Sequence, residues 1–575
     1  MKFYNQIFYF LILAFVLAIG SCKLDSKLDQ EVLRIRIQDE PDCLNPILSQ
    51  SGISTQIENY IMPPLFEYEG NQLELAPILI KELTPEIELN DSIIEYHYQF
   101  IDIAEWSNGN KLSAADLDFT IKAALNPYIK NKTWRNLFKN IISIQSEKPE
   151  AQSFRIQLKK DFLLSREMSG NYNLYPEYFY DPKQIMRKFS LQDLQKKDSV
   201  QFTIEEHQAL KQFADEFQNE QFCKKQIQGA GAYQLKEWTS GSKIVLEKKK
   251  NWWGDKLPQS NSMQKAYPER IEYQVIPDDV SALVSIKNGS LDLSEFPPKI
   301  FSELQKENKL QFATPIVMQY NYIELNTKKI GLNEKEVRQA IAHAIDQETF
   351  IISQMQGLAQ RVIGPVNPSK SFYNKELVPY SYDLEKSKTL LANAGWKDTD
   401  ADGVLDKLIQ GKKVKLEYKM LISGKDLGKN LALHVQEQCK KIGIAIEIVS
   451  KESAALRKDL VERNFDLSPA SSGQTPGLWD PYQSWHSSNT KTPGTNRSGF
   501  ATNTTDSLIQ IIRTSSDVQE RDLAYKKFQA ILYEEQPQIF LFSPTARIAY
   551  QKNLKVNPTV KRPGYNENEI QKGLK

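Results

Sequence analysis

Histidine is scarce in this chain of 575 residues, and none of its five copies stands in a recognisable catalytic spacing. They are His97, His207, His343, His434 and His486. The chain also has no GxSxG or HExxH motif, which argues against the serine hydrolases and zinc peptidases that carry those motifs. Carboxylates are abundant, so a retaining glycosidase, which needs a pair of them, stays open as the enzymatic alternative.

An excess of charge of either sign is missing as well. The 73 basic and 72 acidic residues leave a formal net charge of +1, which gives no electrostatic reason to expect nucleic acid as a partner. Hydrophobic residues make up 40% and charged residues 25% of the chain, as in ordinary globular proteins. A chain of 575 residues is too long for one core, so we expect at least two or three compact units.

Long apolar runs are limited to one, Ile7–Ile19 near the N-terminus. At about 13 residues it is too short to span a bilayer comfortably, but it suits the core of a signal peptide. The run ends in Ile-Gly-Ser-Cys22, which resembles the acylation motif of bacterial lipoproteins. We predict a signal peptide over residues 1–21, acylation of Cys22 and a polar tether over residues 22–31. An ordinary secretory signal followed by a chance cysteine is the alternative.

Cysteine is rare, and three copies remain after Cys22: Cys43, Cys223 and Cys439. An odd number in an exported chain allows at most one internal disulfide, and the sequence does not choose the pair. No CxxC or metal-like spacing is present. We therefore predict structural or free thiols, and neither a metal site nor a cofactor.

Two stretches combine a strand pattern with an amphipathic helix pattern. In Ile94–Pro127, alternating aromatic residues precede a turn and a helix that Ser113 caps, with Asp116 at its third position. In Tyr320–Asp346, aromatic and β-branched residues predict a strand, and Asn333 is placed to cap the helix that follows. Alternation of strands and helices along the chain predicts an α/β protein.

These two stretches belong to a set of at least six runs, spread over residues 32–550, that occur in the order found in one protein family. Others are a run with the letters GAGAYQLKEW and the segment Asp39–Pro46, DEPDCLNP. Together they resemble the bacterial extracellular solute-binding proteins of family 5. That family includes the oligopeptide- and dipeptide-binding proteins of ABC importers.

The resemblance implies an α/β, two-lobed, periplasmic-binding-protein-like (Venus-flytrap) fold with an extra small domain inserted in the first lobe. The expected division is 32–322 for the first lobe, with the insert at roughly 66–200. Residues 323–540 would form the second lobe, and residues 541–575 would return to the first.

The same resemblance implies a monomeric lipoprotein that is not an enzyme and that faces the periplasm or cell exterior. It would capture peptides or peptide-like solutes between its lobes and deliver them to an ABC import permease in the membrane. A binding protein that feeds a sensor would have the same sequence features, and it stands as an alternative beside the glycosidase.

Carried over residue by residue, the resemblance places Asp42 and Cys43 on one side of the ligand. Tyr320 and Tyr322 would lie on the hinge side. The lid would be the loop 474–485, with Gln474, Trp479, Asp480, Tyr482 and Trp485 facing the ligand. Packing in the core is an equally good explanation of the aromatic residues among them.

The lid departs from the family pattern at one position. Oligopeptide binders place an aspartate about four residues before a proline, where it pairs with the ligand's α-ammonium. Four residues before Pro481 this chain has Gly477. Either the loop shifts so that Asp480 serves as the anchor, which is our prediction, or the ligand has no free amine. In the second case the lid aromatics suit an apolar or cationic solute.

A turn in the second half of the chain imitates a calcium-binding loop. Asp398–Gly403 matches the first half of such a loop, and Asp406 stands at the ninth position. The twelfth position, where a bidentate glutamate closes the cage, is Ile409. We therefore predict a polar turn that does not need calcium.

Overall fold

The computed structural model describes residues 32–69, 73–196, 202–258, 261–424, 426–474, 476–492, 494–515 and 517–573. The predicted signal peptide, the tether and the acylation site Cys22 lie outside this part of the chain. Within it, no helix combines the length and the apolar character that a membrane span requires.

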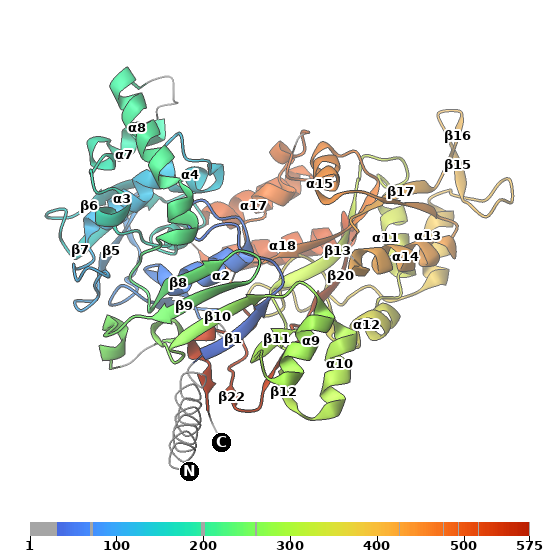
Figure 1. Ribbon diagram of the computed structural model, residues 1–575. Helices are drawn as coiled ribbons and strands as arrows, with labels where there is room; N and C mark the ends of the chain where they lie inside the picture. Colours follow the sequence, from blue (N-terminus) through green and yellow to red (C-terminus); the bar gives the residue numbers. More distant parts are fainter. Residues whose placement is uncertain are drawn as a thin grey trace, which may run out of the picture.

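A seven-stranded mixed sheet forms the centre of the first lobe (Figure 1). In spatial order its strands are β12 (Leu310–Ala313), β21 (Ile548–Gln551), β11 (Leu293–Glu295), β1 (Val32–Ile37), β10 (Arg270–Val275), β9 (Lys243–Lys248) and β8 (Tyr233–Thr239). β1 runs parallel to β10 and β11, and the apolar side chains of Leu33 and Ile35 are buried. Helices α2 (Gly52–Ile61), α9 (Asp279–Asn288) and α10 (Pro298–Glu307) contact strands of this sheet.

A four-stranded antiparallel sheet is inserted in the first lobe between β1 and β8. Its strands in spatial order are β4 (Ile87–Asn90), β5 (Ile93–Gln99), β7 (Ser153–Lys159) and β6 (Ile141–Gln145). Helix α3 (Ala114–Leu125) begins as its sequence predicts, because the Asp116 carboxylate accepts from the backbone N–H and the hydroxyl of Ser113, at 3.0 and 2.9 Å. Helices α4 (Lys132–Phe138), α7 (Leu191–Lys196) and α8 (Ile204–Phe217) complete this part.

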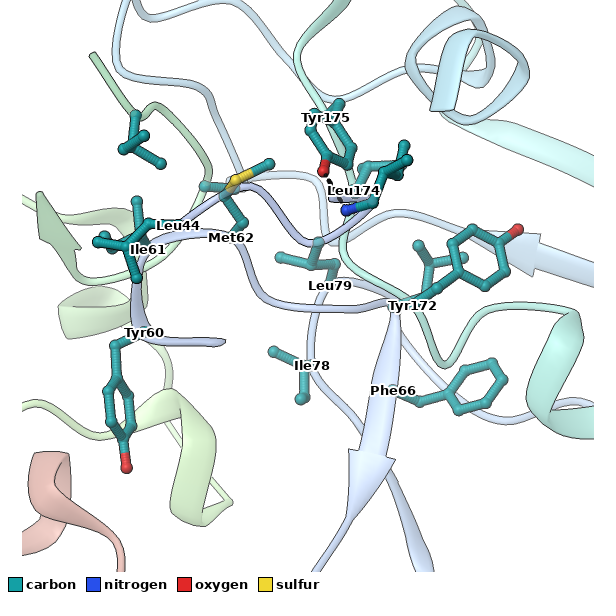
Figure 2. Close-up of a cluster of buried hydrophobic side chains, with 14 of the residues drawn as sticks. Leu44, Tyr60, Ile61, Met62, Phe66, Ile78, Leu79, Tyr172, Leu174 and Tyr175 are labelled. Carbon is teal, nitrogen blue, oxygen red and sulfur yellow. Dashed lines mark hydrogen bonds between the residues drawn. The ribbon is translucent and has the colours of Figure 1, made fainter. Parts of the chain in front are cut away.

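The insert and the seven-stranded sheet share one continuous cluster of buried apolar side chains. Figure 2 shows part of it, in which Leu44, Tyr60 and Phe66 lie in one cluster with Tyr175, a residue that comes much later in the chain. The Tyr175 hydroxyl donates to the Asn45 side chain at 2.6 Å, so the polar end of this buried ring is satisfied. The insert is therefore part of the packing of the first lobe.

A six-stranded sheet forms the second lobe. In spatial order it contains β14 (Ala359–Arg361), β20 (Gln538–Pro544), β13 (Gln319–Leu325), β19 (Leu467–Gly473), β17 (Glu417–Ile422) and β18 (Ala445–Ser450). One face is covered by α11 (Lys335–Ala344), α12 (Gln347–Met355), α13 (Leu384–Asn393) and α14 (Asp426–Lys440), and the other by α17 (Asn503–Thr514) and α18 (Val518–Glu535). β13 serves both faces by alternation: Ile323 and Leu325 pack on one side, and Tyr320 and Tyr322 on the other.

Two short segments, residues 314–318 and 545–547, connect the lobes. Backbone hydrogen bonds between them hold them side by side. The change of sheet therefore falls a few residues from the expected boundaries at 322 and 540. The reason is that β13 and β20 pair with each other in the second sheet.

Candidate ligand-binding site

The two lobes meet at a place that we call the lobe junction, formed by Tyr68, Leu163, Glu167, Lys370 and Gly477. Leu163 belongs to the first lobe but packs in an apolar cluster of the second lobe that includes Tyr320 and Tyr322. Gly477, in the loop 474–485 of the second lobe, lies directly against Tyr68 and Glu167 of the first. The lobe junction is thus one of the contacts between the lobes, beside that of α10 with α12, and opening of the lobes would separate its two sides.

The first-lobe side of the junction is a hydrogen-bonded pair. Tyr68 ends β2 (Phe66–Tyr68), and Glu167 lies in the short helix α5 (Ser165–Met168). The Tyr68 hydroxyl donates to Glu167 Oε1 at 2.6 Å. Burial raises the pKa of Tyr68, and the charge of Glu167 raises it further, so Tyr68 stays a protonated donor. The neighbouring Arg166 points elsewhere, since its guanidinium lies over the Tyr96 ring at 4.2 Å.

The second-lobe side contributes a buried lysine. Lys370 is only 8% exposed, and its side-chain amine donates to the Gly477 carbonyl at 2.5 Å. Burial lowers the pKa of Lys370 to about 8, and the nearby Glu167 carboxylate acts in the opposite direction. Opposite charges from the two lobes therefore face one another across the junction.

The hinge-side tyrosines lie where the sequence predicted a strand. The Tyr320 and Tyr322 rings are stacked with centroids 5.1 Å apart, and Tyr320 also contacts Phe540 at 6.2 Å. Burial raises the pKa of both hydroxyls. Because their cluster includes Leu163 from the first lobe, the two rings stand at the edge of the junction.

Asp480 in the lid is engaged by its own lobe. One carboxylate oxygen accepts from the Arg513 side chain at 3.2 Å, and the other accepts from the Tyr482 backbone N–H at 2.9 Å. The Arg513 guanidinium also lies over the Tyr482 ring, 4.2 Å from its centroid. Both oxygens that an amine would need thus have partners already.

The lid tryptophans pack on helix α18. Trp485 is 2% exposed and contacts Phe528 edge-on, at 6.4 Å between ring centroids. Trp479 stacks near Tyr525, whose hydroxyl donates to the Trp479 carbonyl at 2.5 Å. Packing accounts for Trp485 completely, whereas the partly exposed Trp479 keeps some surface free.

Gln474 fixes the start of the lid. Its backbone N–H donates to the Met318 carbonyl at 2.8 Å, in one of the segments that connect the lobes. Its side-chain amide donates to the Pro365 carbonyl, and its Oε1 is shielded from solvent without a hydrogen-bond partner among the described residues. The lid is therefore tied directly to the hinge.

Asp42 and Cys43 have contacts within the first lobe. The Asp42 carboxylate accepts from the Ser54 hydroxyl at 2.7 Å and from the Gln50 N–H at 2.9 Å, next to the start of α2. Cys43 is buried in a disulfide with Cys223, with Cα atoms 4.6 Å apart. The structure thus selects the pair that the sequence left open, and Cys439 is free and buried.

Sequence reasoning missed Tyr68, Glu167 and Lys370 as site residues. Each stands in an irregular or very short element, where no periodicity distinguishes a side chain at the junction from one in solvent. Their proximity arises from contacts between distant segments, 99 residues apart for Tyr68 and Glu167 and 107 residues apart for Lys370 and Gly477. Only the tertiary fold brings them together.

Two lobes, two connecting segments and an insert in the first lobe are the architecture of periplasmic binding proteins. The oligopeptide-binding protein AppA from Bacillus subtilis, solved with a nonapeptide, shares this fold with a TM-score of 0.71. The two chains are 24% identical, with 94% of this chain and 98% of that one covered. NikA from Brucella suis, solved with Fe(III)-EDTA, has a TM-score of 0.73 at 20% identity, with 94% and 99% covered.

Residues 90–496 match the family described as bacterial extracellular solute-binding proteins, family 5 Middle, and the chain belongs to this family. Oligopeptide-binding protein AppA of Bacillus subtilis strain 168 is 27% identical over 521 residues, 90% of this chain and 86% of AppA. A nickel-binding periplasmic protein of Escherichia coli strain K12 is 25% identical over 233 residues, 40% of this chain and 42% of that protein. The protein is thus a solute-binding protein of family 5.

Proposed function

We propose that this protein captures peptides or peptide-like solutes between its two lobes and delivers them to an ABC import permease. The observation that carries the proposal is the similarity to an oligopeptide-binding protein over 90% of this chain, at 27% identity. The stacked tyrosines at the hinge and the hydrogen-bonding groups at the lobe junction suit a ligand with both apolar and polar parts.

Capture proceeds by rotation of the lobes about the segments 314–318 and 545–547. Two short segments held side by side allow one rigid body to turn against the other with little change elsewhere. Opening separates Gly477 from Tyr68 and Glu167. Closing over a ligand removes the ligand from water.

Mass spectrometry of the ligand released from purified protein tests the proposal. We expect peptides, and titration calorimetry with a mixed library of di- to hexapeptides is expected to show binding. A metal chelate or haem as the released ligand, with no peptide binding, would overturn the peptide assignment and leave the family unchanged. Relatives that bind nickel or haem make these the relevant alternatives.

We further propose that the protein is a lipoprotein anchored through Cys22 and facing the periplasm or cell exterior. The apolar run that ends in Ile-Gly-Ser-Cys22 supports this, as does the Cys43–Cys223 disulfide, since disulfides persist in oxidising compartments. Cys22→Ser is expected to abolish palmitate labelling and to release the protein from the membrane fraction. Labelling that persists in this variant would contradict the anchor.

A further inference from the structure

The lobe junction contains a carboxylate that is satisfied on one side only. Glu167 Oε1 accepts from the Tyr68 hydroxyl at 2.6 Å. Glu167 Oε2 is shielded from solvent and has no hydrogen-bond partner among the described residues. A carboxylate oxygen in that position is costly, because native proteins nearly always provide a donor for such a group. The free oxygen is therefore able to accept from a donor outside the chain.

Gly477 shows that the volume beside this carboxylate is reserved for the first lobe. A Cβ atom on residue 477 would overlap the Tyr68 hydroxyl and would lie 2.7 Å from Glu167 Oε1. A lid side chain at this position and the Tyr68–Glu167 pair are mutually exclusive. The acid at the junction thus comes from the first lobe, while the lid supplies only backbone.

The charged groups around Glu167 leave its oxygen free. Lys370 interacts with the carboxylate electrostatically, but its amine donates to the Gly477 carbonyl at 2.5 Å. Tyr525 is also close enough to feel the charge of Glu167, and its hydroxyl donates to the Trp479 carbonyl. Both groups belong to the second lobe, so their positions relative to Glu167 change when the lobes open.

We propose that Glu167 accepts the cationic group of the ligand, a primary ammonium such as a peptide N-terminus. Tyr68 holds the carboxylate in place through Oε1, and the ligand ammonium donates to Oε2 in a charge-assisted hydrogen bond. The positive charge of Lys370 lies near the same carboxylate and would repel a bound ammonium. The inference rests on the proposed function and names its specificity-determining residue.

The test compares free and N-acetylated versions of one library of di- to hexapeptides by titration calorimetry. Glu167→Gln is expected to weaken binding of the free peptides about 10- to 100-fold and to leave the acetylated peptides unchanged. Glutamine keeps the acceptor for Tyr68, so the fold is preserved. Asp480→Asn is the matched control, because this acid is paired with Arg513, and it is expected to leave the ratio of free to acetylated affinities unchanged.

Lys370→Met provides a test of opposite sign, since it removes the charge and keeps the apolar stem. Free peptides are expected to bind this variant at least as tightly as the native protein. A tenfold loss of affinity for free peptides in Lys370→Met would overturn the assignment of Glu167. So would a tenfold loss in Asp480→Asn together with an unchanged affinity in Glu167→Gln. An equal loss for free and acetylated peptides in Glu167→Gln would do so too, because it would show a merely structural role. If the native protein binds no peptide of either library, the proposed function itself fails.

Discussion

The first and second lobes carry comparable sheets but are held together differently. The disulfide between Cys43 and Cys223 joins positions 180 residues apart and ties the insert to the beginning of the first lobe. In the second lobe the cysteine described is Cys439, which is buried and free. Reducing conditions therefore act on the lobe that carries Glu167, whereas the described part of the other lobe has no disulfide and is held by packing, hydrogen bonds and ion pairs such as that of Arg338 with Glu535.

Burial raises the pKa of a glutamate to about 7 in each lobe, Glu567 in the first and Glu324 in the second, and the two carboxyls have different partners. Glu567, in the C-terminal segment, accepts hydrogen bonds from Tyr60 and Gln56, and burial raises its pKa to about 7. In the second lobe burial raises the pKa of Glu324 to about 7, while Gln538 and the positive charge of Arg497 act in the opposite direction. The first-lobe acid has only neutral donors.

Loss of the disulfide is expected to have the largest effect on the difference in stability between the two lobes. In Cys43→Ser/Cys223→Ser the free energy of unfolding is expected to fall by about 2–5 kcal/mol, because a long loop in the unfolded chain is released. Urea denaturation measures the loss, and hydrogen exchange locates it. Amides of β1 should lose protection, and amides of β13 should keep it. Equal loss in both lobes would show that they unfold as one unit.

The buried acid of the C-terminal segment should give the next largest effect. The folded pKa of Glu567, about 7, lies above its ordinary value of 4.5, so the folded state binds the proton more tightly. The contribution of this carboxyl to stability is then largest below pH 4.5, and about 3 kcal/mol of it is lost as the pH rises to 7.

Glu567→Gln removes this titration, and thermal melts between pH 4.5 and 8 are expected to show a flatter pH dependence than the native protein. Glu324→Gln is the matched variant in the second lobe, where protection of β13 is expected to respond instead of β1. An unchanged pH dependence in Glu567→Gln would show that its carboxyl is not the group that titrates.

A single methyl group in the lid is expected to weaken the contact between the two lobes at the lobe junction. Gly477→Ala brings a Cβ atom into the Tyr68 hydroxyl, and such overpacking costs about 1–3 kcal/mol, which corresponds to about a tenfold weaker peptide affinity. Small-angle scattering is expected to show a more open molecule. Gly473→Ala is the control, because a Cβ there has no atom within 4 Å. Equal affinities in the two variants would contradict the closed contact.

The smallest effect is expected at the turn of the second lobe that imitates a calcium loop. The carboxylates of Asp398, Asp400 and Asp406 lie within 4.8 Å of one another. Lys413 pairs with Asp400 at 2.7 Å and with Asp406 at 3.1 Å. Its ammonium group therefore already supplies the positive charge that a calcium ion would bring to these carboxylates. A chelator is therefore expected to leave the melting temperature unchanged. A drop that added calcium restores would show a bound ion.

Local patterns in the sequence predicted most elements well. The helix predicted to begin at Ser113 is α3, and the Asp116 carboxylate accepts from the Ser113 N–H at 3.0 Å. The cap expected at Asn333 was wrong by one residue, since the structure has Glu334 at the N-cap of α11 without a side-chain hydrogen bond. These features depend on neighbours within a few residues, which is why the sequence contains them.

The site was harder to predict, because it depends on contacts between distant segments. The sequence predicted Asp480 as the anchor, but it could not show that the Asp480 carboxylate already accepts a hydrogen bond from Arg513. The sequence shows Gly477 as a departure from the family pattern. The structure explains this glycine, because a Cβ atom there would overlap the Tyr68 hydroxyl of the other lobe. A missing side chain in one loop can be understood only together with the loop that it meets.

The strand order also has a consequence for how the molecule is assembled from its N-terminus. β21 lies between β11 and β12, so the first lobe lacks an interior strand until residues 548–551 are available. The last strand of the second sheet, β20, ends before that point, at Pro544. All strands of the second lobe are therefore present while the first sheet is still interrupted. The lobe that begins the chain is the last to be completed, and a chain truncated before Ile548 should fold its second half only.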